Sequence, residues 1–384
     1  MKVRNSKLIG ASIAVAVLAI AGWAFRKKGQ VSPPSSAKQA VLSETSQEAA
    51  FSRPELPGSP TRDEASQRIR GLAEELANTR SSAEAREVLR KLRAYLVSLP
   101  KEVSTAAIHE FLVGGADLRT KLAFKISHGG QLSEAPSLRV WLLDSLGQID
   151  RQAAADYART ILAGPASPDE WAVSLRDYAL VRTSPEDVVF IKGKLREMLH
   201  NAAWQQNPSA GYLEAFDAIV HTKATDLTLD LTQLLRKQDN RALAHAAYLT
   251  LDRLVLEQPK AVLSQLASEV DAMGGREQTR ANYFARADVR DTEQRGLVES
   301  YLLDPRRTPE ELQAFAGIYP NANFMISNNL LTQTQTPSRE ELVAHDREAL
   351  GVVRAWLADP RFASVRPYLQ QMHDRLRQFQ VEGH

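Results

Sequence analysis

An internal repeat in the middle of the chain restricts the folds that this chain can adopt. Four segments superimpose when they are aligned on an aspartate, and successive aspartates stand 33, 40 and 35 residues apart. The positions eleven, fourteen and eighteen residues after each aspartate are mostly apolar, a spacing that places them on one face of an α-helix. Repeats of this length are typical of stacked helical units. The four aspartates are Asp144, Asp177, Asp217 and Asp252.

Within each unit a short polar bridge separates two apolar stretches. The bridges read GQID, RTSPED, HTKATD and LEQPK, and Pro185 and Pro259 stand where the first turn of a helix tolerates proline. Each unit is therefore predicted to be a pair of antiparallel helices. A degenerate fifth copy aligned on Arg93 precedes the four. We interpret the aspartates as helix-end caps or as salt-bridge partners of a neighbouring unit, not as catalytic groups.

The stretch from about Leu89 to Met273 resembles a HEAT-type α-solenoid. The resemblance rests on the paired helices, the repeat length and the alanine- and leucine-rich interior of each pair. It is architectural and covers about half of the chain. It implies a stack of units that present an extended surface, which such proteins use to hold other proteins.

The amino terminus predicts a membrane anchor. Three basic side chains in residues 1–7 precede eighteen uncharged, mostly apolar residues, Leu8 to Phe25. A helix of that length just crosses a hydrocarbon core of roughly 30 Å. The sequence Ala19-Ile20-Ala21 offers the alternative, a signal peptide that is cleaved there. The three cations of residues 26–28 favour retention, because a mature exported amino terminus is usually less basic.

The flanking charges also bear on orientation. Each flank of the apolar segment holds three basic side chains, and the amino-terminal amine adds one charge to the short tail, residues 1–7. We therefore expect a cytoplasmic tail and a single-pass protein of the inner membrane. The bulk of the chain is then expected on the periplasmic or other extracytoplasmic side.

The sequence divides beyond the apolar segment. Residues 26–62 are rich in proline and serine and predict a disordered tether. A capping box from Thr61 to Glu64 marks the first helix, and a second box, Ser81 to Glu84, marks the next. We expect a helical-repeat domain over 63–273, an arginine-rich polar connection over 274–291 and a carboxy-terminal helical subdomain over 292–384.

The carboxy-terminal part shows its own helix starts. Helices are expected to begin at Thr292, after Thr308 and after Ser338, which forms a capping box with Glu341. The preceding arginines are interpreted as a solvated surface, although they could also face an acidic partner or lipid headgroups. These arginines are Arg276, Arg280, Arg286, Arg290 and Arg295.

The composition of the chain excludes several classes of binding and catalytic site. The chain has 48 basic and 46 acidic residues that are interspersed, so the basic stripe expected of a nucleic-acid-binding protein is missing. There is no cysteine, which excludes disulfides, thiolate metal sites and cysteine nucleophiles and agrees with export. We expect no cofactor and no nucleic-acid partner.

Catalytic motifs are weak throughout. The Ser98-x-x-Lys101 pattern has the form of the nucleophile box of penicillin-interacting enzymes, and Ser327-Asn328-Asn329 loosely matches their second box, but the third box is absent. The pairs His345-Asp346 and His373-Asp374 lack further metal ligands in order. The region of Glu299 faintly resembles the catalytic glutamate of lytic transglycosylases, without their second motif.

The sequence thus favours a membrane-tethered helical-repeat scaffold that binds a partner protein of unknown identity, as in envelope assembly, secretion or motility complexes. We assign no catalytic, cofactor-binding or metal-binding residue. One alternative is an envelope hydrolase in the carboxy-terminal part, for which Glu299 should lie at the foot of a cleft lined by Tyr301 and Tyr319. The other is a membrane-anchored foldase or chaperone.

Overall fold

The computed structural model describes residues 60–237, 239–323, 325–333 and 336–381. The chain divides into two units, Met1–Pro54 and Glu55–His384, and every described residue belongs to the second. The expected cytoplasmic tail, membrane anchor and nearly all of the expected tether lie outside the described residues. No described helix combines the length and the apolar character that crossing a membrane requires.

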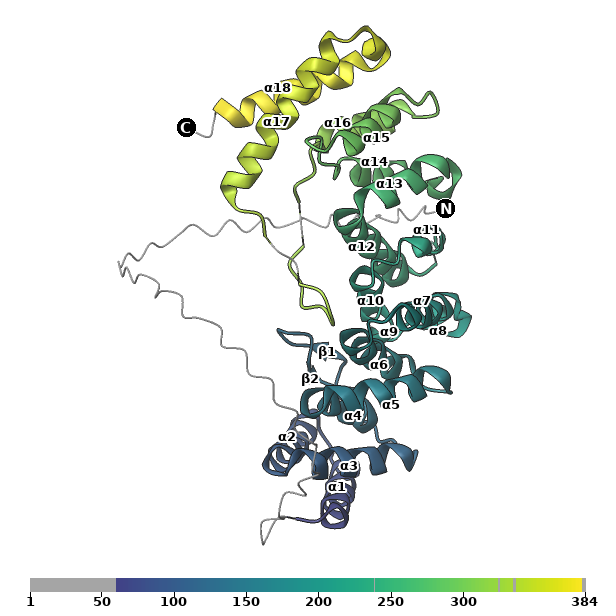
Figure 1. Cartoon of the computed structure of the whole chain (residues 1–384), viewed down its shortest axis with the longest axis vertical. Helices are drawn as coiled ribbons and strands as arrows, with labels where there is room; N and C mark the ends of the chain where they lie inside the picture. The colour runs from purple at the N-terminus through teal and green to yellow at the C-terminus, as the bar shows by residue number, and fades with distance from the viewer. Residues whose placement is uncertain (1–59, 238, 324, 334–335, 382–384) are drawn as a thin grey trace, which may run out of the picture. The chain divides into compact units, whose positions relative to one another are not determined.

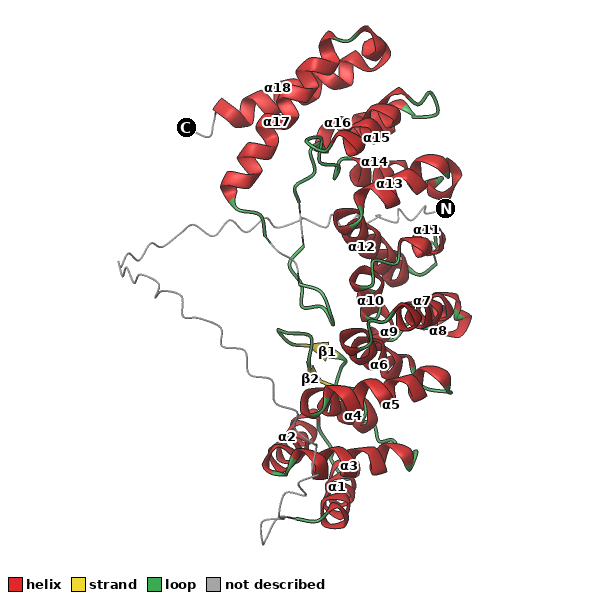
Figure 2. Ribbon diagram, in the orientation of Figure 1, coloured by secondary structure: helices red, strands yellow, loops and turns green. Residues whose placement is uncertain are grey.

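The described chain is all-α, as the sequence predicts (Figure 2). Its described residues also include two short strands, which form an antiparallel hairpin that was not predicted from the sequence. They are β1 (Lys125–Ile126) and β2 (Leu132–Glu134).

Local sequence signals set most helix starts. The Thr61 hydroxyl accepts from the Glu64 backbone N–H and the Glu64 carboxylate accepts from the Thr61 N–H, which completes the expected capping box. The Ser338–Glu341 box forms in the same way. The second box is only half made, because the Glu84 carboxylate accepts from the Arg80 N–H instead.

The helices of each predicted pair are present. The polar bridges and prolines fall between the two helices of a pair or in the helix turns that adjoin this gap. The third pair differs, because its first helix is divided into two short helices that are separated at Ala215 and Phe216. The Ser209 hydroxyl and the Gly211 N–H both donate to the Asp169 carboxylate at the start of the first of them. The pairs are α2 (Ser82–Ser98) with α3 (Lys101–Val113), α4 (Leu138–Ile149) with α5 (Arg151–Ala163), α6 (Pro168–Val181) with α7 (Pro185–His200), α9 (Ala210–Glu214) and α10 (Asp217–His221) with α11 (Thr228–Leu235), and α12 (Arg241–Glu257) with α13 (Pro259–Ser268).

The remaining elements flank these pairs. The segment 274–291, expected to be a polar connection, contains the helix α14. Helices also begin at or next to the three starts expected beyond it. The elements are α1 (Arg62–Ala77), α8 (Ala202–Gln206), η1 (Thr225–Leu227), η2 (Val270–Met273), α14 (Glu277–Phe284), α15 (Thr292–Leu303), α16 (Pro309–Ile318), α17 (Arg339–Ala358), η3 (Pro360–Val365) and α18 (Arg366–Val381).

The helices pack on their near neighbours in the sequence (Figure 1). Helix α3 contacts α1 and α4, α5 contacts α4 and α6, α6 contacts α9, and α12 contacts α10, α11 and α13. The order continues through α13 on α15, α14 on α16, and α16 and α17 on α18. One hydrophobic core runs through all of these contacts.

The repeat positions supply part of that core. Of the twelve side chains at the three apolar offsets, all but Val188 and Val270 are buried. The helical phase inferred from the sequence is therefore confirmed for the repeat. Burial of these faces, at about 25 cal/mol per Å² of apolar surface, is what holds successive helices together.

Candidate functional site

The four repeat aspartates are buried in the first half of each helix pair. Asp144 lies in α4, Asp177 in α6, Asp217 at the start of α10 and Asp252 in α12. A buried carboxylate is costly unless it is paired and hydrogen-bonded. Their partners therefore determine what this part of the molecule can do.

Three of the aspartates bind an arginine further along the chain, which lies in the next unit for Asp144 and Asp217 and just after α14 for Asp252. Arg176 Nη1 donates to Asp144 Oδ1 at 2.5 Å, and Arg253 Nη2 donates to Asp217 Oδ1 at 2.7 Å. Two further donors, on the Arg286 guanidinium, bind the two oxygens of the Asp252 carboxylate at 2.9 and 2.7 Å. The salt bridge to a neighbouring unit is thus confirmed for Asp144 and Asp217, whereas Asp252 is bridged to the segment that follows α14. We call the three the first, second and third inter-unit pairs: Asp144–Arg176, Asp217–Arg253 and Asp252–Arg286.

Asp177 is the exception. It accepts from Arg176, its neighbour in the sequence, at 2.8 Å, so one guanidinium serves two carboxylates. Burial raises the pKa of Asp177 to about 6, and the nearby Asp144 carboxylate adds to this effect while Arg176 opposes it. A Cβ atom at Gly147 would stand 2.8 Å from the Asp177 carboxylate, so the close approach of α4 depends on this glycine.

The first inter-unit pair also holds the β-hairpin. The Leu132 N–H donates to Asp144 Oδ1 at 3.1 Å, and Arg176 Nη1 donates to the Gly130 carbonyl at 2.9 Å. One backbone donor and one backbone acceptor of the hairpin are therefore satisfied by the two side chains of one pair.

The second and third pairs hold the segment between α16 and α17 in the same manner. We call its described residues, 319–323 and 325–333, the return segment. Asp217 Oδ2 accepts from the Leu331 and Thr332 N–H groups at 2.6 and 2.9 Å, and Oδ1 accepts from the Thr332 hydroxyl at 2.5 Å. Arg286 Nη1 donates to the Asn321 carbonyl at 3.1 Å and also to the Asn323 carbonyl.

The return segment reaches the hairpin. Gly130 has φ +83°, a conformation that L-residues rarely adopt, and a Cβ atom there would overlap the Leu330 carbonyl oxygen. Figure 2 shows the two loops approaching each other beside the helices. Segments about 200 residues apart in the sequence thus lie side by side on one face of the helices.

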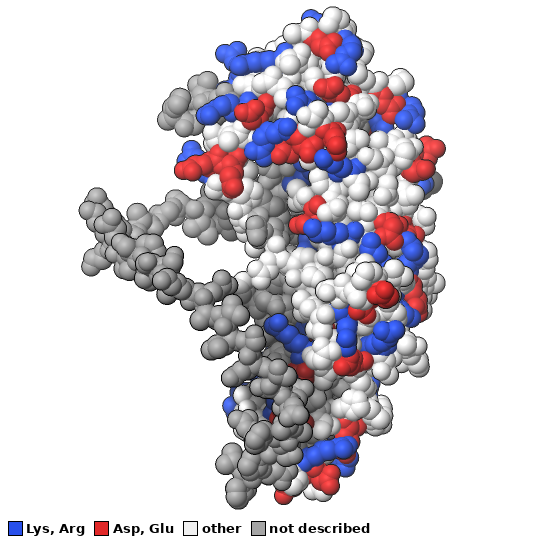
Figure 3. All heavy atoms as spheres, in the orientation of Figure 1, with Lys and Arg blue, Asp and Glu red and all other residues white. Residues whose placement is uncertain are grey.

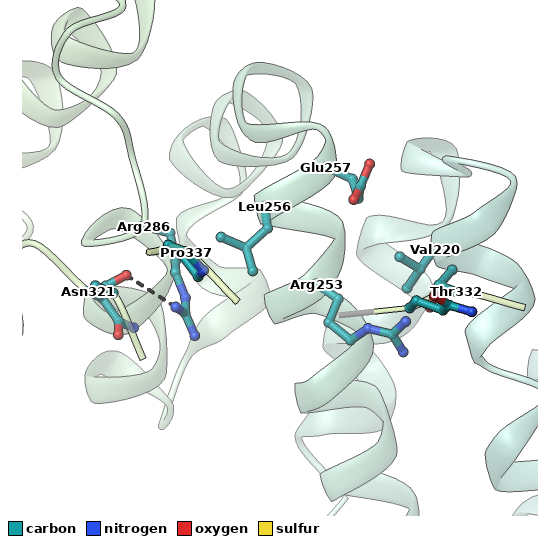
Figure 4. A pocket seen from close by; sticks show the side chains of 10 residues that line it. Val220, Arg253, Leu256, Glu257, Arg286, Asn321, Thr332 and Pro337 are labelled. Atoms are coloured by element: carbon teal, nitrogen blue, oxygen red, sulfur yellow. Dashed lines mark hydrogen bonds between the residues drawn. The ribbon is translucent and has the colours of Figure 1, made fainter. Parts of the chain in front are cut away.

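A pocket of about 410 Å³ lies between the second and third pairs. In Figure 4 the side chain of Leu256 stands between Arg286 and Arg253, and the dashed line marks the bond from Arg286 to Asn321. Both ends of the return segment contribute to its wall. The lining residues are Val220, Arg253, Leu256, Glu257, Arg286, Asn321, Ala322, Thr332, Gln333 and Pro337.

Charges around the pocket balance among the described side chains. Both arginines that line it are paired with aspartates, and the Glu257 carboxylate stands 4.0 Å from Lys223 Nζ. Three cations therefore face three carboxylates. The face shown in Figure 3 likewise has basic and acidic side chains interspersed.

The expectation of a solvated arginine surface over 274–291 is wrong for two of its members. Arg280 is buried and forms two bonds to the fully buried Glu311, at 2.8 and 2.6 Å, and the Arg286 side chain is 5% exposed. Arg290 is exposed and paired with Asp288, as expected. The error arises because the partners of Arg280 and Arg286 are more than 30 residues away in the sequence and not adjacent to them.

The geometry required by the hydrolase alternative is not found at Glu299. Its carboxylate accepts from Trp356 Nε1 at 2.9 Å and borders a shallow pocket of about 360 Å³. Tyr301 and Tyr319 are buried in the core and do not line this pocket. The Tyr301 hydroxyl instead donates to Glu311 at 2.9 Å.

The other motif residues have local partners. Ser98 donates to the Tyr95 carbonyl at 2.7 Å, while Lys101 pairs with Asp150 at 3.1 Å. In the other weak box, the Ser327 hydroxyl donates to Asn329 Oδ1 at 2.7 Å. His373 contacts its neighbour Asp374 at 3.0 Å, and within the described ranges no three His, Asp or Glu side chains are grouped to hold a metal ion.

The arginines of the inter-unit pairs were missed at the sequence level, although a signal exists. Arg176 immediately precedes Asp177, and Arg253 immediately follows Asp252, so two of the three stand next to a repeat aspartate. Each turns toward the carboxylate of the preceding unit.

No protein-family model matches the chain, and neither a curated protein nor a solved structure matches it. Function is therefore inferred from the geometry of the chain itself.

Proposed function

We propose that this chain is a membrane-tethered helical-repeat scaffold of the HEAT-like α-solenoid type, and that it binds a partner protein outside the cytoplasmic membrane. One observation carries the proposal. The inter-unit pairs bind the backbone of two non-helical segments of the chain itself, at three points along the helices. A surface that recognises non-helical backbone within its own chain has the kinds of groups required to recognise that of another protein.

The succession of helix–helix contacts supports the scaffold. In repeat proteins each unit contacts its neighbours, and the resulting extended surface serves to bind other proteins. The helices here pack mainly on their near neighbours in the sequence. Three charged pairs, each with a largely buried carboxylate, join elements that follow one another along the chain.

The membrane part of the proposal rests on the sequence. The apolar segment Leu8 to Phe25 would cross the inner membrane once, and residues 26–62 would hold the helical part away from the bilayer on the periplasmic side. A reporter that is active only outside the cytoplasm, fused after Gln380, is then active. An inactive reporter in a stably expressed fusion would place the helical part inside.

Crosslinking in intact cells tests the binding function. The full chain, with its amino-terminal segment in place, is crosslinked, purified under denaturing conditions and compared with an uncrosslinked control. The proposal requires a defined partner protein well above background. Absence of any partner contradicts the proposal, and degradation of peptidoglycan by the purified chain would then favour the hydrolase alternative.

A further inference from the structure

We infer that the pocket between the second and third inter-unit pairs binds a non-helical peptide segment of the partner, with one apolar side chain seated against Leu256. The inference rests on the proposed function, because it names the site and the chemistry of the partner that the scaffold holds. Three features of the described residues carry it.

The first feature is the mode of binding already present on this face. The carboxylate of the second pair accepts two successive backbone N–H groups, and the guanidinium of the third pair donates to two backbone carbonyls. The pocket lies between these two points and is lined by both arginines. Because the return segment already occupies those groups, a peptide in the pocket would lie beside the bound backbone and would meet the Arg253, Glu257 and Gln333 side chains that line the pocket.

The second feature is an apolar wall at the centre of the pocket. Leu256 is 48% exposed and lines the pocket, so its side chain is accessible to a ligand. Val220, Ala322 and Pro337 line the same space. These side chains would remove one apolar side chain of a ligand from water, which supplies affinity that backbone hydrogen bonds alone do not.

The third feature is the charge balance. A phosphate or another small anion at the two arginines would also face the carboxylates of Asp217, Asp252 and Glu257. A neutral backbone meets no such repulsion, because its N–H and C=O groups suit paired carboxylates and guanidinium groups equally. The volume of about 410 Å³ is within the range of ligand pockets and admits a short stretch of chain.

The test uses a random peptide library displayed on phage and panned against the purified full chain in detergent. Enriched peptides are synthesised and titrated against the wild type, the Leu256→Arg variant and the Leu180→Arg variant. Leu180 is a matched control, because it is 49% exposed, lies on α6 and does not line the pocket. Both substitutions are at exposed positions, and equal melting temperatures confirm that both variants fold.

The inference requires peptides that share an apolar residue and whose Kd rises about tenfold or more with Leu256→Arg but stays near the wild-type value with Leu180→Arg. Failure to enrich any peptide overturns it, as does equal binding to both variants. Competition of the bound peptide by inorganic phosphate would show an anion site and would also overturn it. If the Leu256→Arg variant still binds a partner protein in cells, this inference fails while the proposed function stands. If the wild-type chain captures no partner protein in cells, both the inference and the proposed function fail.

Discussion

Arg253 on α12 donates a hydrogen bond of 2.7 Å to Asp217 at the start of α10, and the same carboxylate accepts from Leu331 and Thr332. One buried side chain thus joins two successive units and fixes the return segment. Removing its charge leaves Arg253 and two backbone donors with a poorer acceptor, so Asp217→Asn should lower the free energy of unfolding by about 2–3 kcal/mol. Urea unfolding measures this effect.

The control for that prediction is Asp226→Asn. Asp226 also pairs with cations, Lys192 and Arg196, but its side chain is 43% exposed. An exposed pair contributes about 1 kcal/mol or less. Equal losses in the two variants would show that the second inter-unit pair has no special structural role.

A second buried network lies beyond the repeat. Glu311 is fully buried and accepts from Arg280 and from the Tyr301 hydroxyl, so Glu311→Ala would leave a buried guanidinium without its partner. We expect a loss of about 3–5 kcal/mol in thermal or urea unfolding. Glu310→Ala, one residue away in the same first turn and exposed, should cost no more than about 1 kcal/mol. The interpretation is wrong if the two substitutions have similar effects.

Asp177 predicts a pH dependence. Burial raises its pKa from 3.8 to about 6, so between these values the folded chain holds a proton that the unfolded chain releases. The free energy of unfolding contributed by this group therefore falls as pH rises through that window. Asp177→Asn removes the penalty, so the variant should be more stable than the wild type above about pH 6, and the difference should vanish below about pH 4. Melting curves across this range measure it, and parallel curves for the two proteins would contradict it.

Substitutions at the adjacent Gly129 and Gly130 distinguish the effect of backbone strain from the effect of contact with the return segment. Gly129 and Gly130 both have positive φ, so alanine at either position costs about 1 kcal/mol in backbone energy. Only at Gly130 would the added Cβ overlap the Leu330 carbonyl. Gly130→Ala should therefore accelerate hydrogen exchange at the Leu331 and Thr332 amides, whereas Gly129→Ala should not. Equal exchange in both variants would show that the hairpin does not support the return segment.

The sequence was sufficient for the helices because their determinants are local. The Thr61–Glu64 and Ser338–Glu341 boxes, the polar bridges and the apolar spacing all act within a few turns. The hairpin at 125–134 was missed because its strands are two and three residues long and depend on Asp144 and Arg176.

The candidate site could not be predicted from the sequence, because its contacts join residues that are far apart along the chain. The aspartates were recognised, but Leu331 is 114 residues from the carboxylate that binds it. The periodicity of the repeat carries no information about such a contact. The arginines over 274–291 show the same limit. The charges next to them in the sequence suggested that they are exposed to solvent, whereas Arg280 pairs with Glu311 and Arg286 pairs with Asp252 in the structure.

The most direct test of the scaffold is where a partner touches it. A photo-crosslinking amino acid is placed at position 256 or at position 180 of the full chain, and intact cells are irradiated. We expect a defined protein adduct from position 256 and none above background from position 180. Adducts of equal yield at both positions, or a partner captured elsewhere on the chain but never from position 256, would contradict it.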